Sequence, residues 1–234
     1  MLNALYVEIS IVGILLLVII LISQRESMGT SAPQRQFNRM IYALIAILII
    51  DAATWVIDGQ QFPYARQMNI FIESWYYFFN ALMPFMWAVY SELTLNRNIR
   101  SAQKRVRWLG LPTIIFAGLV ILNLGNGRLF FVDEQNVYHR GEWYIITAVF
   151  AYAYLLYSSI RALVKASKVK WSTERKQYLL MAAFIIPPTI GGVVQTFYYG
   201  VTCIWICTAI SIVMVYIDML NRQISTESLT GLNN

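Results

Sequence analysis

The chain has 234 residues, of which 58% are hydrophobic and 13% charged, with a formal net charge of +6 at pH 7. Soluble globular domains are nearer half apolar and a quarter charged, so this composition excludes a disordered chain, a coiled coil and an ordinary soluble enzyme. It is typical of a polytopic membrane protein. A membrane helix needs roughly 20 residues, so the length allows about seven spans and no separate catalytic domain of ordinary size.

Long apolar runs predict seven membrane helices. Their expected bounds are 4–23, 40–58, 70–95, 108–124, 143–160, 178–199 and 201–221. The first run lacks a basic leader and a clear cleavage site, which favours a retained helix over a signal peptide. Tyr199 and Gly200 predict a tight turn between the last two spans, and Pro187-Pro188 predicts a kink in the sixth. The expected fold is therefore an all-α polytopic bundle of seven transmembrane helices.

Basic residues predict the orientation of this bundle. All but three of the 18 Lys and Arg residues fall in 24–39, 96–107, 161–177 and the C-terminal tail; the exceptions are Arg66, Arg128 and Arg140. Because cytoplasmic loops carry the basic excess, we expect the N-terminus outside and the C-terminus in the cytoplasm, in the plasma or inner membrane. Topology and attraction to anionic lipids then explain the net positive charge, and no nucleic-acid partner is expected.

The longest expected outer segment, 125–142, contains LFFVD and VYHRG on either side of EQN. Both flanks are rich in strand-forming residues, which predicts a short β-hairpin over the outer mouth of the bundle. A hairpin of this size is marginal alone, so it should pack against helix ends.

Several familiar chemistries are missing from the chain. His139 is the only histidine, which excludes a bis-histidine haem and argues against a zinc site. The five lysines all lie in expected cytoplasmic loops, so none is placed to bind retinal. We expect no catalytic residue, no metal site and no cofactor in this chain.

Polar side chains concentrate in the outer half of the predicted spans. Asp51, Trp55 and Asp58 follow i, i+4, i+7 spacing in the second span, and the third repeats such a stripe from Glu73 to Asn80. Carboxylates in a bilayer are costly and usually face the bundle interior. The expected ligand-binding residues are Asp51, Trp55, Asp58, Glu73, Tyr76, Tyr77, Asn80, Gln195 and Tyr198.

This set predicts a small-ligand pocket, because such pockets combine aromatic walls with a few convergent polar groups. Asp51 is the deepest member, and the acidic lining favours a cation, a hydrogen-bond donor or protons. The alternative for each single residue is an ordinary interhelical hydrogen bond or a place in the interfacial aromatic belt.

The C-terminal segment 226–234 reads TESLTGLNN. It resembles the opening of GGDEF-type diguanylate cyclase domains, which typically reads D-x-L-T-G-L-x-N-R, with Glu227 in place of the usual Asp. The matching residues are Leu229, Thr230, Gly231, Leu232 and Asn234. The rest of the chain is similar to the seven-helix N-terminal sensor regions that precede such cyclases in bacteria.

The resemblance implies a parent enzyme that dimerises, uses Mg and GTP, and makes cyclic di-GMP. The GG(D/E)EF signature and its metal and GTP contacts are absent from these residues, so the chain itself is expected to have no cyclase activity. The implied organisation is a membrane sensor domain over 1–221, followed over 222–234 by a linker and the first residues of a truncated GGDEF domain. A homodimer would form through the linker helix of the last span.

The leading hypothesis is a membrane sensor that detects an extracytoplasmic small ligand or physical cue and controls a C-terminal diguanylate cyclase. The alternative is a small-solute transporter or channel, although no internal repeat of the kind that builds many transporters is visible. The sequence lacks the motifs that are expected of a eukaryotic-style seven-helix receptor, which argues against that class. An intramembrane enzyme would have only Asp51 and Asn80 near the membrane middle.

Overall fold

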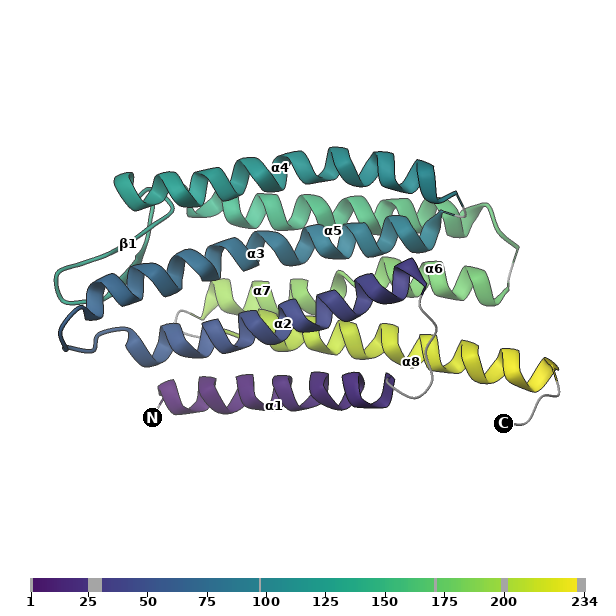
Figure 1. Ribbon diagram of the computed structural model, residues 1–234, viewed down its shortest axis with the longest axis horizontal. Coiled ribbons are helices and arrows are strands. Elements are labelled where there is room, and N and C mark those ends of the chain that lie inside the picture. Colours follow the sequence, from purple (N-terminus) through teal and green to yellow (C-terminus); the bar gives the residue numbers. More distant parts are fainter. Residues whose placement is uncertain (1, 25–30, 97, 171, 199–201, 231–234) are drawn as a thin grey trace.

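The computed structural model describes residues 2–24, 31–96, 98–170, 172–198 and 202–230. These residues form eight helices and a two-stranded hairpin. The elements are α1 (Leu2–Gln24), α2 (Ala32–Ile57), α3 (Ala65–Leu95), α4 (Ile99–Asn126), β1 (Phe130–Val132), β2 (Tyr138–Arg140), α5 (Tyr144–Ser167), α6 (Thr173–Ala183), α7 (Ile186–Phe197) and α8 (Ile204–Thr230). Figure 1 shows the helices lying along the long axis of the molecule, with the hairpin at one end. We call this end the hairpin end. The opposite end, where α8 finishes, is here called the tail end.

Six helical segments are long and apolar enough to cross a membrane. They are Tyr6–Gln24, Ala32–Ile57, Arg100–Asn126, Tyr144–Ser167, Thr173–Gln195 and Ile204–Arg222. The protein is therefore a membrane-embedded helical bundle. Helix α3 is not among the six, because Glu73, Asn80 and Glu92 lower its hydropathy.

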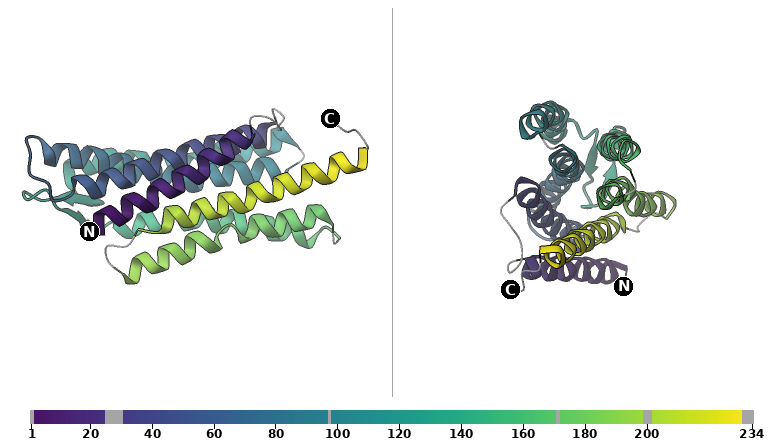
Figure 2. Two further views of the ribbon diagram at one scale, coloured as in Figure 1. Left: turned by 90° about the horizontal axis from the view of Figure 1, so that it is seen from below. Right: turned by 90° about the vertical axis from the view of Figure 1, so that its right-hand side faces the viewer.

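Helix α3 lies inside the bundle and packs against α2, α4 and α5. The end-on view in Figure 2 shows the other helices arranged around this part of the molecule. The Trp87 ring of α3 stacks on Phe184 at a centroid distance of 3.5 Å, which joins α3 to the segment between α6 and α7. Buried Phe37, Met40 and Leu44 of α2 complete this part of the core. Because Glu73 and Glu92 are buried, α3 can carry these carboxylates without exposing them to lipid.

The sixth predicted span is divided into α6 and α7 at Phe184 and Ile185. Pro187 and Pro188 lack the N–H groups that would bond to carbonyls four residues earlier, and this interrupts the helix. Neighbouring hydroxyls satisfy carbonyls at the break: Ser211 Oγ donates to Phe184 O at 3.0 Å, and Ser159 Oγ donates to Ala182 O at 3.0 Å. Such bonds allow a broken helix inside a membrane bundle.

The hairpin pairs Phe130 with Arg140 and Val132 with Tyr138 in antiparallel register. Asn136 in its turn has a φ of 61°, a conformation that Asn tolerates better than most residues. Its amide donates to Ile57 O at 2.8 Å and to Gln60 O at 2.9 Å. These bonds tie the hairpin to the loop that joins α2 and α3.

Helix boundaries differ from the predicted spans mainly at the tail end. Helix α2 begins at Ala32, where the Ser31 side chain accepts a bond from Gln34 N at 3.4 Å, because capping and a first-turn proline extend the helix beyond its apolar core. Helix α8 continues to Thr230, past the apolar run that ends at 221. The expected turn at Tyr199 and Gly200 lies outside the described residues, as does the tail from Gly231 onward.

Candidate functional site

A cavity of about 680 Å³ lies at the hairpin end, between α2, α3, α5 and α7, with the hairpin residue Tyr138 in its wall. Its volume is within the usual range of small-molecule sites. The wall includes the exposed residues Arg140, Ile145 and Phe197, so the cavity opens to the surface.

Two helical stripes supply the polar wall. Asp51 and Trp55 project from α2, Asp58 follows the last residue of that helix, and Glu73, Tyr76, Tyr77 and Asn80 project from α3. Their spacing places each set on one helix face, and the two faces meet across the cavity. Gln195 of α7 also lines it.

Tyr198 is the one predicted site residue that lies outside this wall; its side chain is 66% exposed. Helix α7 ends at Phe197, and Tyr198 adopts an extended conformation that turns its side chain away from the face of Gln195. Helical spacing therefore does not apply to Tyr198.

The three carboxylates of the wall have different surroundings. Asp58 Oδ1 accepts bonds from Tyr138 N at 2.7 Å and from Asn69 Nδ2 at 3.5 Å, so it holds the hairpin in place. Asp51 is 4% exposed and lies beside Thr202. Glu73 is 6% exposed, and no described residue donates a hydrogen bond to its carboxylate.

Aromatic groups form much of the remaining wall. The hydroxyls of Tyr77 and Tyr138 lie 2.7 Å apart, which links α3 to the hairpin. Trp205 Nε1 of α8 donates to Tyr76 Oη at 3.2 Å. The Arg140 guanidinium lies over the Tyr144 ring at 4.4 Å, so this wall already holds a cation against a ring face at its rim.

Sequence reasoning missed four residues of α5 that line the cavity. Tyr144, Thr147, Ala148 and Ala151 line it, and they follow i, i+3, i+4, i+7 spacing. This stripe of small and polar residues was the available signal. Its residues are individually unremarkable in a membrane helix, whereas the carboxylates of α2 and α3 are not.

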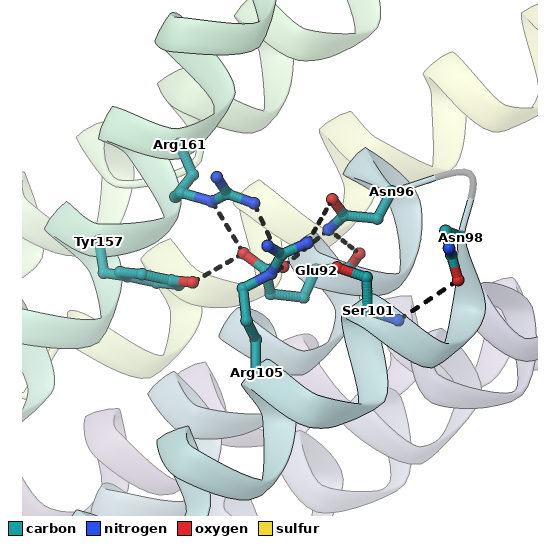
Figure 3. Close-up of polar contacts among 7 residues, drawn as sticks. All are labelled: Glu92, Asn96, Asn98, Ser101, Arg105, Tyr157 and Arg161. Carbon is teal, nitrogen blue, oxygen red and sulfur yellow. Dashed lines mark hydrogen bonds and ion pairs between the residues drawn. The ribbon is translucent and has the colours of Figure 1, made fainter.

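A second polar cluster lies near the tail end, around Glu92 of α3 (Figure 3). The Glu92 side chain is fully buried, and its oxygens accept bonds from Arg105 Nε at 2.7 Å, Arg161 Nε at 2.9 Å and Tyr157 Oη at 2.7 Å. Asn96 Nδ2 donates to the same carboxylate at 2.7 Å. These bonds join α3, α4 and α5, and the carboxylate is fully partnered. The cluster around Glu92 is therefore a structural ion-pair network that joins three helices, and it is not an open binding site.

Across the described ranges, no group of three or more His, Cys, Asp or Glu side chains is placed to hold a metal ion. Cys203 and Cys207 are both free thiols.

Comparison with known proteins found no match: no family model, no curated protein and no solved structure resembles the chain significantly. The geometry of the cavity and of α8 therefore carries the functional argument.

Proposed function

We propose that the chain is a membrane sensor module that binds a small ligand in the cavity at the hairpin end and passes the signal to the tail end through α8. The observation that carries this proposal is the convergence of two acidic and aromatic stripes, from α2 and α3, on one cavity of about 680 Å³. Interhelical hydrogen bonding alone would not require an open space of this size beside unpartnered carboxylate oxygens.

Helix α8 supplies the route out of the cavity. Ile204, its first residue, lies in the cavity wall, and the Trp205 bond to Tyr76 joins it to α3. The helix then runs for 27 residues, about 40 Å at the usual rise per residue. In Figures 1 and 2 its last turns project beyond the neighbouring helices. A continuous helix can carry a small rotation or tilt over this length.

The orientation belongs to the same proposal. The described basic residues of 31–39, 98–107 and 161–176 lie in or beside the connections at the tail end, which supports a cytoplasmic location for that end. The cavity then faces the exterior. The resemblance of 226–234 to the opening of a GGDEF domain supports a cyclase as the receiver of the signal, with α8 helices paired in a dimer. Ligand binding would shift a two-state equilibrium between productive and unproductive pairings.

Disulfide crosslinking tests the coupling without a known ligand. Asn221→Cys or Ser225→Cys is introduced into a Cys203→Ala, Cys207→Ala background, and crosslinking rates in membranes are compared with and without Ala151→Trp, which fills the cavity. We expect the rate to change at one position or both. Gly118→Trp is the matched control, since a Cβ at Gly118 meets nothing within 4 Å.

Equal rates in all three proteins would contradict the proposal. A transporter is tested separately, because solute flux through liposomes that is blocked by Ala151→Trp, without any change in crosslinking, would favour the alternative. The identity of the receiver is tested by the gene: a GG(D/E)EF sequence downstream of Asn234 supports a cyclase, and another domain there would replace it.

A further inference from the structure

We propose that the ligand of the cavity is a small organic cation, an amine whose ammonium group lies at Glu73 and Asp51 and whose apolar body packs on the tyrosine wall. This inference rests on the proposed ligand-sensing function and specifies its ligand class.

The contrast between Glu73 and Glu92 is the first argument. Both belong to α3, and both are buried. Two arginines, a tyrosine and an asparagine donate to Glu92 (Figure 3), whereas no described residue donates to Glu73. A buried carboxylate without donors is costly, so the fold has left Glu73 to be satisfied by something that enters the cavity.

Two residues that line the cavity beside the carboxylates also have a polar atom without a hydrogen-bond partner. Thr147 is 5% exposed, its Oγ1 has no hydrogen-bond partner, and it lines the cavity from α5. Gln195 Oε1 of α7 is likewise buried without a partner. The Glu73 carboxylate can only accept hydrogen bonds, so the matching ligand must be a donor. An ammonium group supplies three donors and a compensating charge.

The charge and the size of the cavity restrict the class of ligand further. Three carboxylates line the cavity, and Arg140 at the rim is the only basic side chain in the described part of the wall. A bare metal ion would not fill about 680 Å³, and the described residues offer no metal-ligating cluster. The walls of Tyr76, Tyr77 and Tyr144 favour a cation with an apolar or aromatic body, because ring faces attract cations and bury apolar surface.

The test uses probes that share one body and differ in charge. The purified chain in nanodiscs is titrated with phenethylamine, phenethyl alcohol and hydrocinnamate, and with the larger set tryptamine, tryptophol and indolepropionate. Binding is followed by thermal shift and by calorimetry. In at least one set, we expect the amine to bind about tenfold or more tightly than the alcohol, with the acid weakest, which is the ratio expected from one charged hydrogen bond.

Substitutions then locate the ammonium group. Glu73→Gln should weaken the amine about tenfold while leaving the alcohol unchanged, and Asp51→Asn should do the same if Glu73→Gln fails to fold. Glu134→Gln is the matched control, since Glu134 is an exposed carboxylate of the hairpin outside the cavity wall. Its amine affinity should equal that of the unsubstituted chain.

Three outcomes would overturn the inference: an alcohol or acid that binds as tightly as its amine, an amine affinity unchanged by both carboxylate substitutions, or no saturable binding by either amine. In the first case, loss of alcohol binding in Ala151→Trp would leave the ligand-sensing function standing. Failure of that function is measured independently, by crosslinking rates at α8 that do not respond to Ala151→Trp.

Discussion

Glu92→Ala removes the carboxylate that joins three helices near the tail end. In the native protein the side chain is fully buried, and its two oxygens accept bonds from Arg105, Arg161, Tyr157 and Asn96 at 2.7–2.9 Å. After the substitution, two guanidinium groups lose their counter-charge, and the Tyr157 hydroxyl loses its acceptor. No other carboxylate is hydrogen-bonded to these four groups in the described structure.

The expected loss in the free energy of unfolding depends on how far the two arginines are exposed to solvent. Removal of one partner from a buried ion pair typically costs about 3–5 kcal/mol. The side chains of Arg105 and Arg161 are 36% and 28% exposed, so both can recover part of their hydration. We therefore expect a loss of about 3 kcal/mol, at the lower end of that range. Glu92→Gln retains the shape but not the charge and should cost about 1.5–3 kcal/mol.

The assay is reversible unfolding in mixed micelles with increasing SDS, followed by tryptophan fluorescence. Glu142→Ala is the matched control, since Glu142 is exposed at the hairpin end, and it should stay within about 0.5 kcal/mol of the native chain. If Glu92→Ala were as stable as the control, the ion-pair network around Glu92 would contribute nothing to the free energy of unfolding. That result would refute the expected cost of removing this buried carboxylate.

Three further predictions concern the hairpin and the α7–α8 contact. Asn136→Gly keeps the positive φ but loses three side-chain bonds and should cost about 2 kcal/mol, whereas Asn136→Ala should cost about 1 kcal/mol more; equal losses by SDS unfolding would contradict the backbone argument. Gly191→Ala places a Cβ 2.9 Å from the Cα of the first residue of α8, so the melting temperature should fall by an amount equivalent to about 1–3 kcal/mol; an unchanged value would show that the helices separate freely. The Val137 N–H and then His139 lower the pKa of Asp133, so this carboxylate stabilises the hairpin above its unfolded pKa, and that contribution is lost as pH falls through the lower folded pKa. The protection factors of the hairpin amides, which are corrected for the pH dependence of intrinsic exchange, should therefore fall on acidification, and an equal fall in Asp133→Asn would contradict this assignment.

The sequence predicted the positions of the helices well, because apolar runs of membrane length are strong signals. It could not predict that α3 would pack against α2, α4 and α5 at once, because burial by other helices is a property of the whole assembly. The kink in the sixth span was expected from Pro187 and Pro188. The hydroxyls of Ser159 and Ser211 that satisfy the break come from other helices and gave no local signal.

The candidate site was predicted where a single helix carries the information. The stripes from Asp51 and from Glu73 have clear helical periodicity, and both line the cavity. Thr147 and Tyr144 were missed because residues of these types are common in membrane helices, so their helical spacing did not stand out, and Tyr198 was misplaced because α7 ends one residue earlier. The sequence could not predict that Glu92 accepts several hydrogen bonds whereas Glu73 accepts none from the described residues, since the arginine and tyrosine donors to Glu92 come from two other helices.

The most direct test of the whole account is the accessibility of the cavity from each side of the membrane. Asn80→Cys, in the Cys203→Ala, Cys207→Ala background, places a thiol in the cavity wall. A membrane-impermeant maleimide is applied to right-side-out and to inside-out vesicles, with and without saturating tryptamine. We predict labelling in right-side-out vesicles only, slowed by tryptamine. Labelling only in inside-out vesicles, or labelling that tryptamine leaves unchanged while tryptophol slows it, would contradict a cation-binding cavity open to the exterior.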